Sequence, residues 1–287
     1  MSEVGVIEPL TGTAMADKDL TAARASESRS VQRYSAGASA AATAEIASEV
    51  PVAFEYNGIS HAVMLATPAD LEDFAVGFSL SEGIARPSQC YGVEVRVGAA
   101  GITLALEIAS SAFALLKQHR RTLAGRTGCG ICGTESLEQV LRPLPDLSGM
   151  SLRITPAALA RACDSLADVQ PLQQCTGAAH GAVWCGLDGA IVCAREDVGR
   201  HNALDKLIGA LVRNGVESRA GFALVTSRAS VEMVQKSATA GIAVLAAVSA
   251  PTALAVQVAA NCGQTLIGFA RGRAFSVYAH GERIGAG

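Results

Sequence analysis

The chain has 287 residues, half of them hydrophobic, which is enough to bury one large core or two ordinary ones, and we expect two. The 23 basic and 26 acidic side chains leave a formal net charge of −3, so no overall positive field attracts nucleic acid or an anionic membrane. No basic segment followed by an apolar run and no twin-arginine signal marks the chain for export, and we expect a cytoplasmic protein.

Residues 1–46 are rich in Ala, Ser, Thr and Glu and show no sustained apolar period, which predicts a disordered leader. Folded structure is expected from Val52, where alternating apolar residues lie on both sides of Asn57-Gly58 and predict a β-hairpin. Thr67-Pro68-Ala69-Asp70 then predicts the start of a helix, whose apolar residues recur with helical spacing until Gly83.

Two alternating runs, at 91–97 and 102–108, predict further strands, so residues 47–150 are expected to form a smaller, β-rich N-terminal subdomain. After a polar segment, residues 120–133 predict a loop rich in glycine and arginine. A short helix is expected from Thr134.

Beyond residue 150, strands and helices alternate. Thr155-Pro156 predicts a capped helix that carries Cys163 on its buried face. The later segments predict strands near 182–187, 190–194, 221–226, 242–248, 265–270 and 275–279, and helices near 201–213, 230–240 and 252–261. This alternation is typical of parallel crossovers in a sheet covered on both faces, so residues 151–287 predict an α/β domain. The apolar stretch from Ile242 to Ala260 is too interrupted for a membrane span and fits a buried strand followed by a helix.

The clearest chemical motif is Cys129-Gly-Ile-Cys132, in which two thiols lie three residues apart among glycines that let the backbone bend. Nearby arginines and the expected helix start both favour thiolate over thiol, and a thiolate is the species that attacks a sulfur donor. A zinc site would normally need a second pair of cysteines or histidines, which is absent, so no intrinsic metal is expected. A thioredoxin-type dithiol is the other alternative.

Three further segments place arginines directly after predicted strands, where α/β sheets bind ligands. They are Arg195 to Lys206, with seven ionisable residues in twelve positions, Thr226 to Ser230, and Phe269 to Ala274. The first segment also fits a solvated, salt-bridged helix start. Together the three indicate one anion-binding pocket, in which arginines clamp a diphosphate and the aromatic ring stacks on a purine.

With these motifs the chain resembles the formate dehydrogenase accessory sulfurtransferase family, FdhD, over roughly residues 45–287. The resemblance rests on Gly-Cys-Gly-Ile-Cys-Gly at 128–133, on Arg-Glu-Asp-Val-Gly-Arg-His-Asn-Ala-Leu-Asp-Lys at 195–206, and on the run from Ser227 to Gly272. It implies a protein that accepts sulfur from a cysteine desulfurase. The sulfur then passes to the molybdenum bis(guanine dinucleotide) cofactor, a bound substrate here, before that cofactor enters formate dehydrogenase.

By this resemblance, Cys129 carries the persulfide and Cys132 assists it. The guanine dinucleotide is then lined by Phe269, Ala270, Arg271, Gly272, Arg273 and Ala274. The C-terminal domain should be a three-layer α/β domain like that of cytidine deaminases, without their chemistry, because His180-Gly181-Ala182 lacks the glutamate that a zinc deaminase needs. A homodimer is expected from the frequency of such assemblies. A dithiol oxidoreductase and a noncatalytic cofactor chaperone are the alternative functions.

Overall fold

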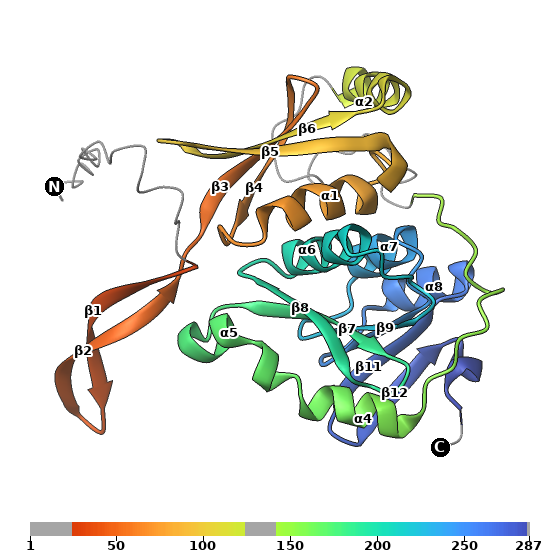
Figure 1. Cartoon of the computed structure of the whole chain (residues 1–287). Helices are drawn as coiled ribbons and strands as arrows, with labels where there is room; N and C mark the ends of the chain where they lie inside the picture. Colours follow the sequence, from red (N-terminus) through yellow and green to blue (C-terminus); the bar gives the residue numbers. More distant parts are fainter. Residues whose placement is uncertain (1–24, 124–141, 286–287) are drawn as a thin grey trace, which may run out of the picture.

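The structure of the protein is a computed structural model that describes residues 25–123 and 142–285, with only the helical backbone of residues 119–123 (Figure 1). It consists of two bodies and a separate two-stranded ribbon, and it contains three sheets. The mixed α/β architecture predicted from the sequence is confirmed.

The N-terminal body is a four-stranded sheet in the order β4-β3-β6-β5. Its strands are β3 (Val50–Tyr56), β4 (Ile59–Ala66), β5 (Cys90–Gly98) and β6 (Gly101–Ile108). Asn57 and Gly58 take the positive φ values of 46° and 81° that a two-residue hairpin turn requires, as predicted. Helix α1 (Leu71–Ser81) covers one face, and Phe78 stacks on Phe54 with 4.1 Å between ring centroids.

Helix α2 (Ser110–Leu123) corrects the prediction for the segment that follows β6. We expected a polar segment and then a loop from Arg120, but the backbone of Arg120 and Arg121 still belongs to the helix. Ala112 and Leu116 lie four residues apart and are buried in the N-terminal core, which is enough to hold one face of the helix. The apolar stripe is short and lies among polar residues, so the sequence pattern did not predict a helix here.

The ribbon corrects the prediction of a disordered leader for residues 26–46, and the part of that prediction that falls on residues 1–24 lies outside the described residues. Strands β1 (Ser26–Ser35) and β2 (Ala38–Ala47) pair in register over ten residues each and are joined by Ala36-Gly37, both at positive φ. Most of their side chains are exposed, so no apolar alternation marked them as strands. The ribbon extends away from both bodies, and β2 also contacts the short helix α5 (Pro171–Thr176) (Figure 1).

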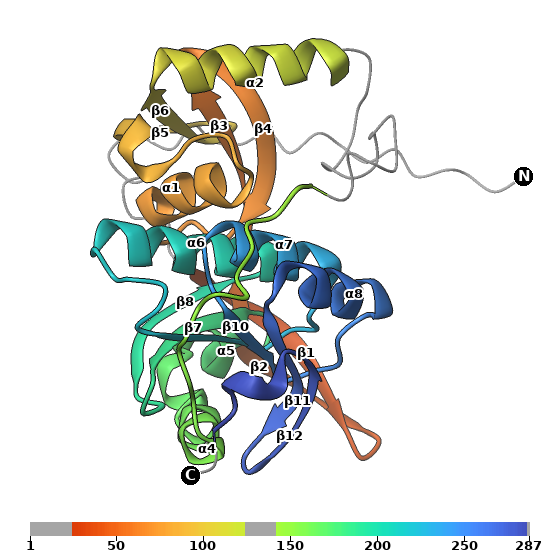
Figure 2. The ribbon, with the colours of Figure 1, turned by 90° about the vertical axis from the view of Figure 1, so that its right-hand side faces the viewer.

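The C-terminal body is a six-stranded sheet in the order β12-β11-β10-β9-β7-β8. Its strands are β7 (His180–Gly186), β8 (Ile191–Asp197), β9 (Gly221–Val225), β10 (Val244–Ala247), β11 (Thr265–Arg271) and β12 (Ala274–Ala279). Its helices are α4 (Pro156–Asp164), α6 (Arg200–Arg213), α7 (Val231–Thr239) and α8 (Ala253–Cys262), with one core between α6, α7, α8 and the sheet and a second between α4 and the opposite face (Figure 2).

The sheet is mixed, whereas the alternation of elements predicted parallel crossovers. Strands β9, β10 and β11 are parallel, as expected. Strand β7 is antiparallel to β8, because the tight turn at Asp188-Gly189 returns the chain beside it, and β7 is also antiparallel to β9. Strand β8 therefore runs in the same direction as β9, and the carboxyl ends of β8, β9, β10 and β11 share one edge with the start of β7.

Helices α1 and α6 join the two bodies and cross at backbone contact. A Cβ atom at Gly77 would lie 1.7 Å from the Asp205 carbonyl oxygen, and one at Gly209 would lie 1.8 Å from that of Asp73. No side chain fits at either position. The two glycines therefore set how closely the N-terminal body approaches α6, which lies between that body and the large sheet (Figures 1 and 2).

Candidate functional site

The carboxyl edge of the large sheet brings together segments that are distant in the sequence. Phe269 N–H donates to the Ser249 carbonyl at 3.1 Å, and Ala229 N–H donates to Ala250 at 3.2 Å. On the other side of β9, Gly181 N–H donates to Thr226 Oγ1 at 2.9 Å. The ends of β11, β10 and β9 and the start of β7 thus form one continuous surface.

The residues predicted to line a guanine dinucleotide lie at one end of this surface. Gly272 and Arg273 form the tight turn between β11 and β12, since Arg271 pairs with Ala274. Phe269 has φ 55° at an irregular point of the strand and is 46% exposed, while Ala270 is buried. The structure therefore displays the aromatic ring and both arginines at the edge.

Arg271 and Arg273 are not neutralised by neighbouring carboxylates. Arg271 Nε donates to the Val248 carbonyl at 3.2 Å, which holds the side chain over the end of β10. In residues 25–123 and 142–285, neither guanidinium forms an ion pair, and the same holds for Arg200 and Arg228 at this edge. Four unpaired cations along one edge favour an anionic ligand.

The segment 195–206 differs from a solvated helix start, because half of its polar residues are buried between the two bodies: Asp197, Asn202, Asp205 and Lys206. Its share in an anion-binding pocket stays a prediction, with Arg200 as the unpaired cation at the edge. Asp197 and Lys206 are fully buried with 2.6 Å between Oδ2 and Nζ, and they bind the backbone N–H and carbonyl of Thr67, at 3.0 and 2.9 Å. Asn202 Nδ2 donates to the Leu65 carbonyl at 2.8 Å.

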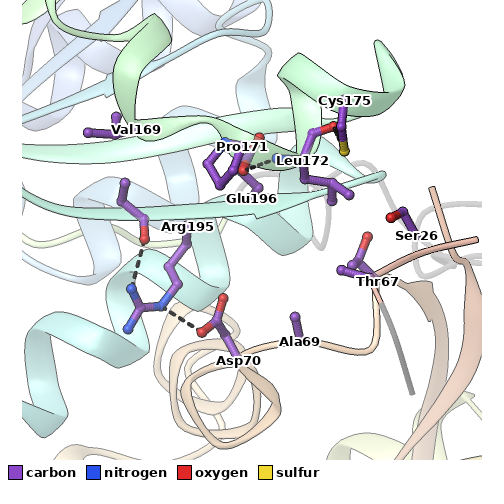
Figure 3. A pocket seen from close by; sticks show the side chains of 12 residues that line it. Ser26, Thr67, Ala69, Asp70, Val169, Pro171, Leu172, Cys175, Arg195 and Glu196 are labelled. Carbon is purple, nitrogen blue, oxygen red and sulfur yellow. Dashed lines mark hydrogen bonds and ion pairs between the residues drawn. The ribbon is translucent and has the colours of Figure 1, made fainter. Parts of the chain in front are cut away.

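The start of the same segment binds the N-terminal body at its surface. Arg195 donates to Asp73 Oδ2 at 2.6 Å. It also lies 3.4 Å from Asp70, while Glu196 accepts from the backbone N–H of Leu172 at 2.9 Å (Figure 3). Asp70, Leu172, Arg195 and Glu196 line a hollow of about 430 Å³ that also borders Cys175. The motif is thus chiefly a joint between the bodies.

A second buried ionic cluster lies in this joint. Lys236 Nζ contacts Asp205 Oδ2 at 2.8 Å and Glu82 Oε1 at 2.6 Å, and Asp205 accepts from Ser81 at 2.5 Å. Arg142 binds Glu82 at 3.2 Å and the Ser81 carbonyl at 3.0 Å. Because Arg142 is the first described residue after position 141, this cluster holds the chain that leaves the Cys-x-x-Cys segment against α1 and α7.

Two histidines of the edge are held neutral. Burial and the nearby Arg200 guanidinium lower the pKa of His180. Burial and Arg200 also lower the pKa of His201, although Glu232 lies 3.3 Å from its Nε2 and opposes the shift. Burial raises the pKa of Glu232, but the hydrogen bond from Ser230 and the contact with His201 outweigh it and lower that pKa.

The predicted sulfur carriers, Cys129 and Cys132, lie outside the described residues. The six cysteines that the structure describes are all free thiols. Burial raises the pKa of Cys185 to about 12, and it also raises the pKa values of Cys90, Cys163, Cys193 and Cys262. These five thiols therefore remain protonated near neutral pH and are poor nucleophiles.

The described residues form neither a metal-ligand cluster nor a membrane-spanning helix. Across the described ranges, no group of three or more His, Cys, Asp or Glu side chains is arranged to hold a metal ion. Among the same residues, no helix is long and apolar enough to cross a bilayer, and the apolar stretch at 242–260 forms β10 and α8 instead.

Comparison with known proteins gives the family. The sequence profile of the FdhD/NarQ family matches residues 47–285. This chain belongs to the FdhD/NarQ family. A relative from Variovorax paradoxus is 56% identical over 243 residues, covering 83% of this chain and 86% of its own length, and one from Cupriavidus necator is 57% identical over 256 residues, covering 88% of each. Both are named "Sulfur carrier protein FdhD".

A crystal structure from Desulfotalea psychrophila shares the fold of this FdhD/NarQ chain. It is described as that of a formate dehydrogenase accessory protein, has a TM-score of 0.72 at 22% identity, and covers 91% of this chain and all of its own. The family membership predicted from the three motifs is confirmed.

Two residues of the FdhD/NarQ site, Glu232 and Arg142, were missed in the sequence. Glu232 contacts His201 because β8 and β9, which flank β7, end at the same edge and are followed there by α6 and α7. Arg142 was missed because its partners, Ser81 and Glu82, lie about sixty positions earlier in the chain. For Glu232, its place in the first turn of a helix that follows a strand was the one available signal.

Proposed function

We infer that this protein is a sulfur carrier that serves the maturation of formate dehydrogenase. The proposal is supported by family membership and by the names of relatives that share more than half of its sequence over most of its length. The donor would be a cysteine desulfurase, and the recipient would be the molybdenum cofactor that formate dehydrogenase receives.

The sulfur would travel on Cys129. Its thiolate attacks the outer sulfur of the donor's persulfide, so that a new S–S bond forms on Cys129 while the donor's S–S bond breaks and its thiolate leaves. The raised pKa values of five described thiols support this choice by elimination. Cys175 is exposed and is the described thiol that a test must exclude.

Chain length limits how far the cysteines can be from Arg142. Position 132 is ten residue steps before Arg142, and ten extended steps span at most about 33–36 Å. Arg142 is held beside Lys236, which follows Glu232 by one helical turn of α7. Anchorage at Arg142 would therefore keep the carrier near the ligand that the edge holds.

The anionic part of the cofactor would bind at Phe269 to Ala274. The observation that carries this step is the row of unpaired arginines, because Arg271 and Arg273 can form charge-assisted hydrogen bonds with phosphate. The exposed ring of Phe269 offers a stacking face for a purine. The cofactor is cargo here, and the protein's part is to bind and orient it.

A cytidine-deaminase-like ancestry of the C-terminal body is part of the proposal. Strand order β8-β7-β9-β10-β11, with β7 reversed, supports it. Zinc-deaminase chemistry does not accompany it. Helix α6 begins Arg-His-Asn-Ala, without the His-x-Glu that supplies the proton-transferring glutamate, and α7 follows Ser230 with Val-Glu-Met, without the two cysteine ligands of the zinc ion.

Mass spectrometry of the intact protein tests the proposal directly. The protein is incubated with a cysteine desulfurase and cysteine, and we expect one added sulfur atom on the wild type and on Cys175→Ser, but none on Cys129→Ser. Sulfur that stays on Cys129→Ser and disappears from Cys175→Ser would refute the choice of carrier. A loss of two hydrogens without added sulfur would instead favour a dithiol oxidoreductase.

A further inference from the structure

The imidazole of His201, in the first turn of α6, uses one ring nitrogen and leaves the other open. Its Nε2 lies 3.3 Å from Glu232 Oε2, in the first turn of α7. Within residues 25–123 and 142–285, Nδ1 has no hydrogen-bond partner, and it is not one of the buried side-chain atoms that lack a partner. This nitrogen is therefore accessible at the sheet edge, where α6 and α7 begin.

Glu232 fixes the tautomer of this ring. Ser230 Oγ donates to Glu232 Oε2 at 2.7 Å. Burial raises the pKa of Glu232, but that hydrogen bond and the contact with His201 lower it overall, so the carboxylate is ionised near neutral pH. Because an ionised carboxylate only accepts hydrogen bonds, Nε2 carries the ring proton and Nδ1 is a bare acceptor.

The charges around the ring keep it neutral. Burial and the Arg200 guanidinium lower the pKa of His201, and Lys236 adds to this. Glu232 opposes the shift without reversing it. An imidazole that is neutral at pH 7 can accept a proton, and a carboxylate beside it stabilises the imidazolium that forms. His201 and Glu232 thus have the arrangement of a general base and the group that orients it.

The second histidine–glutamate pair of the described chain is built differently. His280 Nδ1 lies 3.0 Å from Glu282 Oε1, and its Nε2 lies 2.9 Å from the Ala260 carbonyl oxygen, so both ring nitrogens are engaged. This pair follows β12, whose end pairs with the start of β11, at the opposite edge of the sheet. The open nitrogen of His201 is thus not a general feature of such pairs in this fold.

The proposed carrier is tethered close to this ring. On α7, Lys236 follows Glu232 by four residues, a rise of about 6 Å. Lys236 contacts Glu82 at 2.6 Å, and Arg142 binds the same carboxylate at 3.2 Å. Position 129 is thirteen residue steps before Arg142, which is at most about 43–47 Å of extended chain. The length of this tether allows the thiol of Cys129 to meet the imidazole.

We propose that His201 is the general base of sulfur loading, with Glu232 as its positioning residue. Nδ1 takes the proton of the Cys129 thiol, and the electron pair of the S–H bond stays on sulfur. This step rests on the proposed function, in which the resulting thiolate attacks the outer sulfur of the donor persulfide. The imidazolium then gives its proton to the departing donor thiolate, and the Arg200 cation favours the thiolate form of the carrier.

The rate of sulfur loading from glutathione persulfide, followed by intact mass of the full chain, tests this role without a desulfurase. We expect the wild-type rate to rise with pH through an inflection below the ordinary histidine value of about 6.5, and then to level off. His201→Gln should load about a hundredfold more slowly at pH 7, with a rate that keeps rising toward the ordinary thiol value of about 8.5. Glu232→Gln should lie between the two.

His280→Gln is the matched control, because it removes a histidine–glutamate pair from the opposite edge, and it should load like the wild type. A wild-type rate and pH profile in His201→Gln, or an equal loss in His280→Gln, would overturn the inference. If His201→Gln shows no melting transition, Glu232→Gln decides, and a wild-type profile there overturns the role of the pair. Loading that persists in Cys129→Ser refutes the carrier, whereas loading that needs Cys129 but not His201 refutes only the base.

Discussion

The buried ion pair of Lys206 and Asp197 gives the sharpest stability prediction. Both side chains are fully buried with 2.6 Å between Nζ and Oδ2, and Lys206 also donates to the Thr67 carbonyl in the N-terminal body. Lys206→Met leaves the Asp197 carboxylate without its counter-charge. Removing one member of such a pair costs about 3–5 kcal/mol of unfolding free energy.

Urea denaturation of the full chain measures this loss, with Arg161→Met as the matched control. Arg161 pairs with Asp188 at 2.9 Å, but both side chains are more than half exposed, and exposed pairs contribute about 0–1 kcal/mol. Asp197→Asn in the Lys206→Met background should recover part of the loss, because the unpaired charge is then gone. A cost for Lys206→Met no larger than that for Arg161→Met would refute the view of segment 195–206 as a joint.

The remaining predictions concern the carrier, the nucleotide, metal and pH. Cys129→Ala should abolish formate dehydrogenase maturation with an unchanged melting temperature, whereas Leu207→Ala in the buried core should cost about 2–5 kcal/mol; full maturation by Cys129→Ala would contradict the carrier role. Calorimetry should show guanosine diphosphate binding weakened about ten- to a hundredfold in Arg271→Ala and in Arg273→Ala, and unchanged binding in both would place the nucleotide elsewhere. Elemental analysis of the purified protein should find no stoichiometric zinc, and about one zinc per chain that Cys132→Ala removes would argue for a structural metal site. Because the pKa of His201 is lowered in the fold, the unfolded chain binds the extra proton first, so stability should fall as pH drops below the ordinary histidine value of about 6.5; this slope should be shallower in His201→Gln, and an identical slope would count against the shift.

The local elements were largely predictable because their signals are local. Asn57-Gly58 and Asp188-Gly189 mark their hairpins, and Thr155 caps α4 by accepting from Ala158 N–H at 3.1 Å, as its sequence suggested. Such turns and caps depend on residues a few positions apart. The same dependence explains the missed ribbon, since Ala, Ser and Thr strands with both faces exposed carry no apolar alternation.

The sequence by itself determined the family, the mixed α/β class and the strand ends where arginines gather, because motifs and periodicity survive in one dimension. Tertiary structure alone decided what the charges of segment 195–206 do, since Asp197 is buried against Thr67, which lies 130 positions away in the chain. It also decided that the Gln170 side chain packs against the backbone of Gly181, where a Cβ atom would lie 2.9 Å from Gln170 Cδ. Burial and hydrogen-bond satisfaction depend on which distant segments the fold brings together, and no local pattern encodes that.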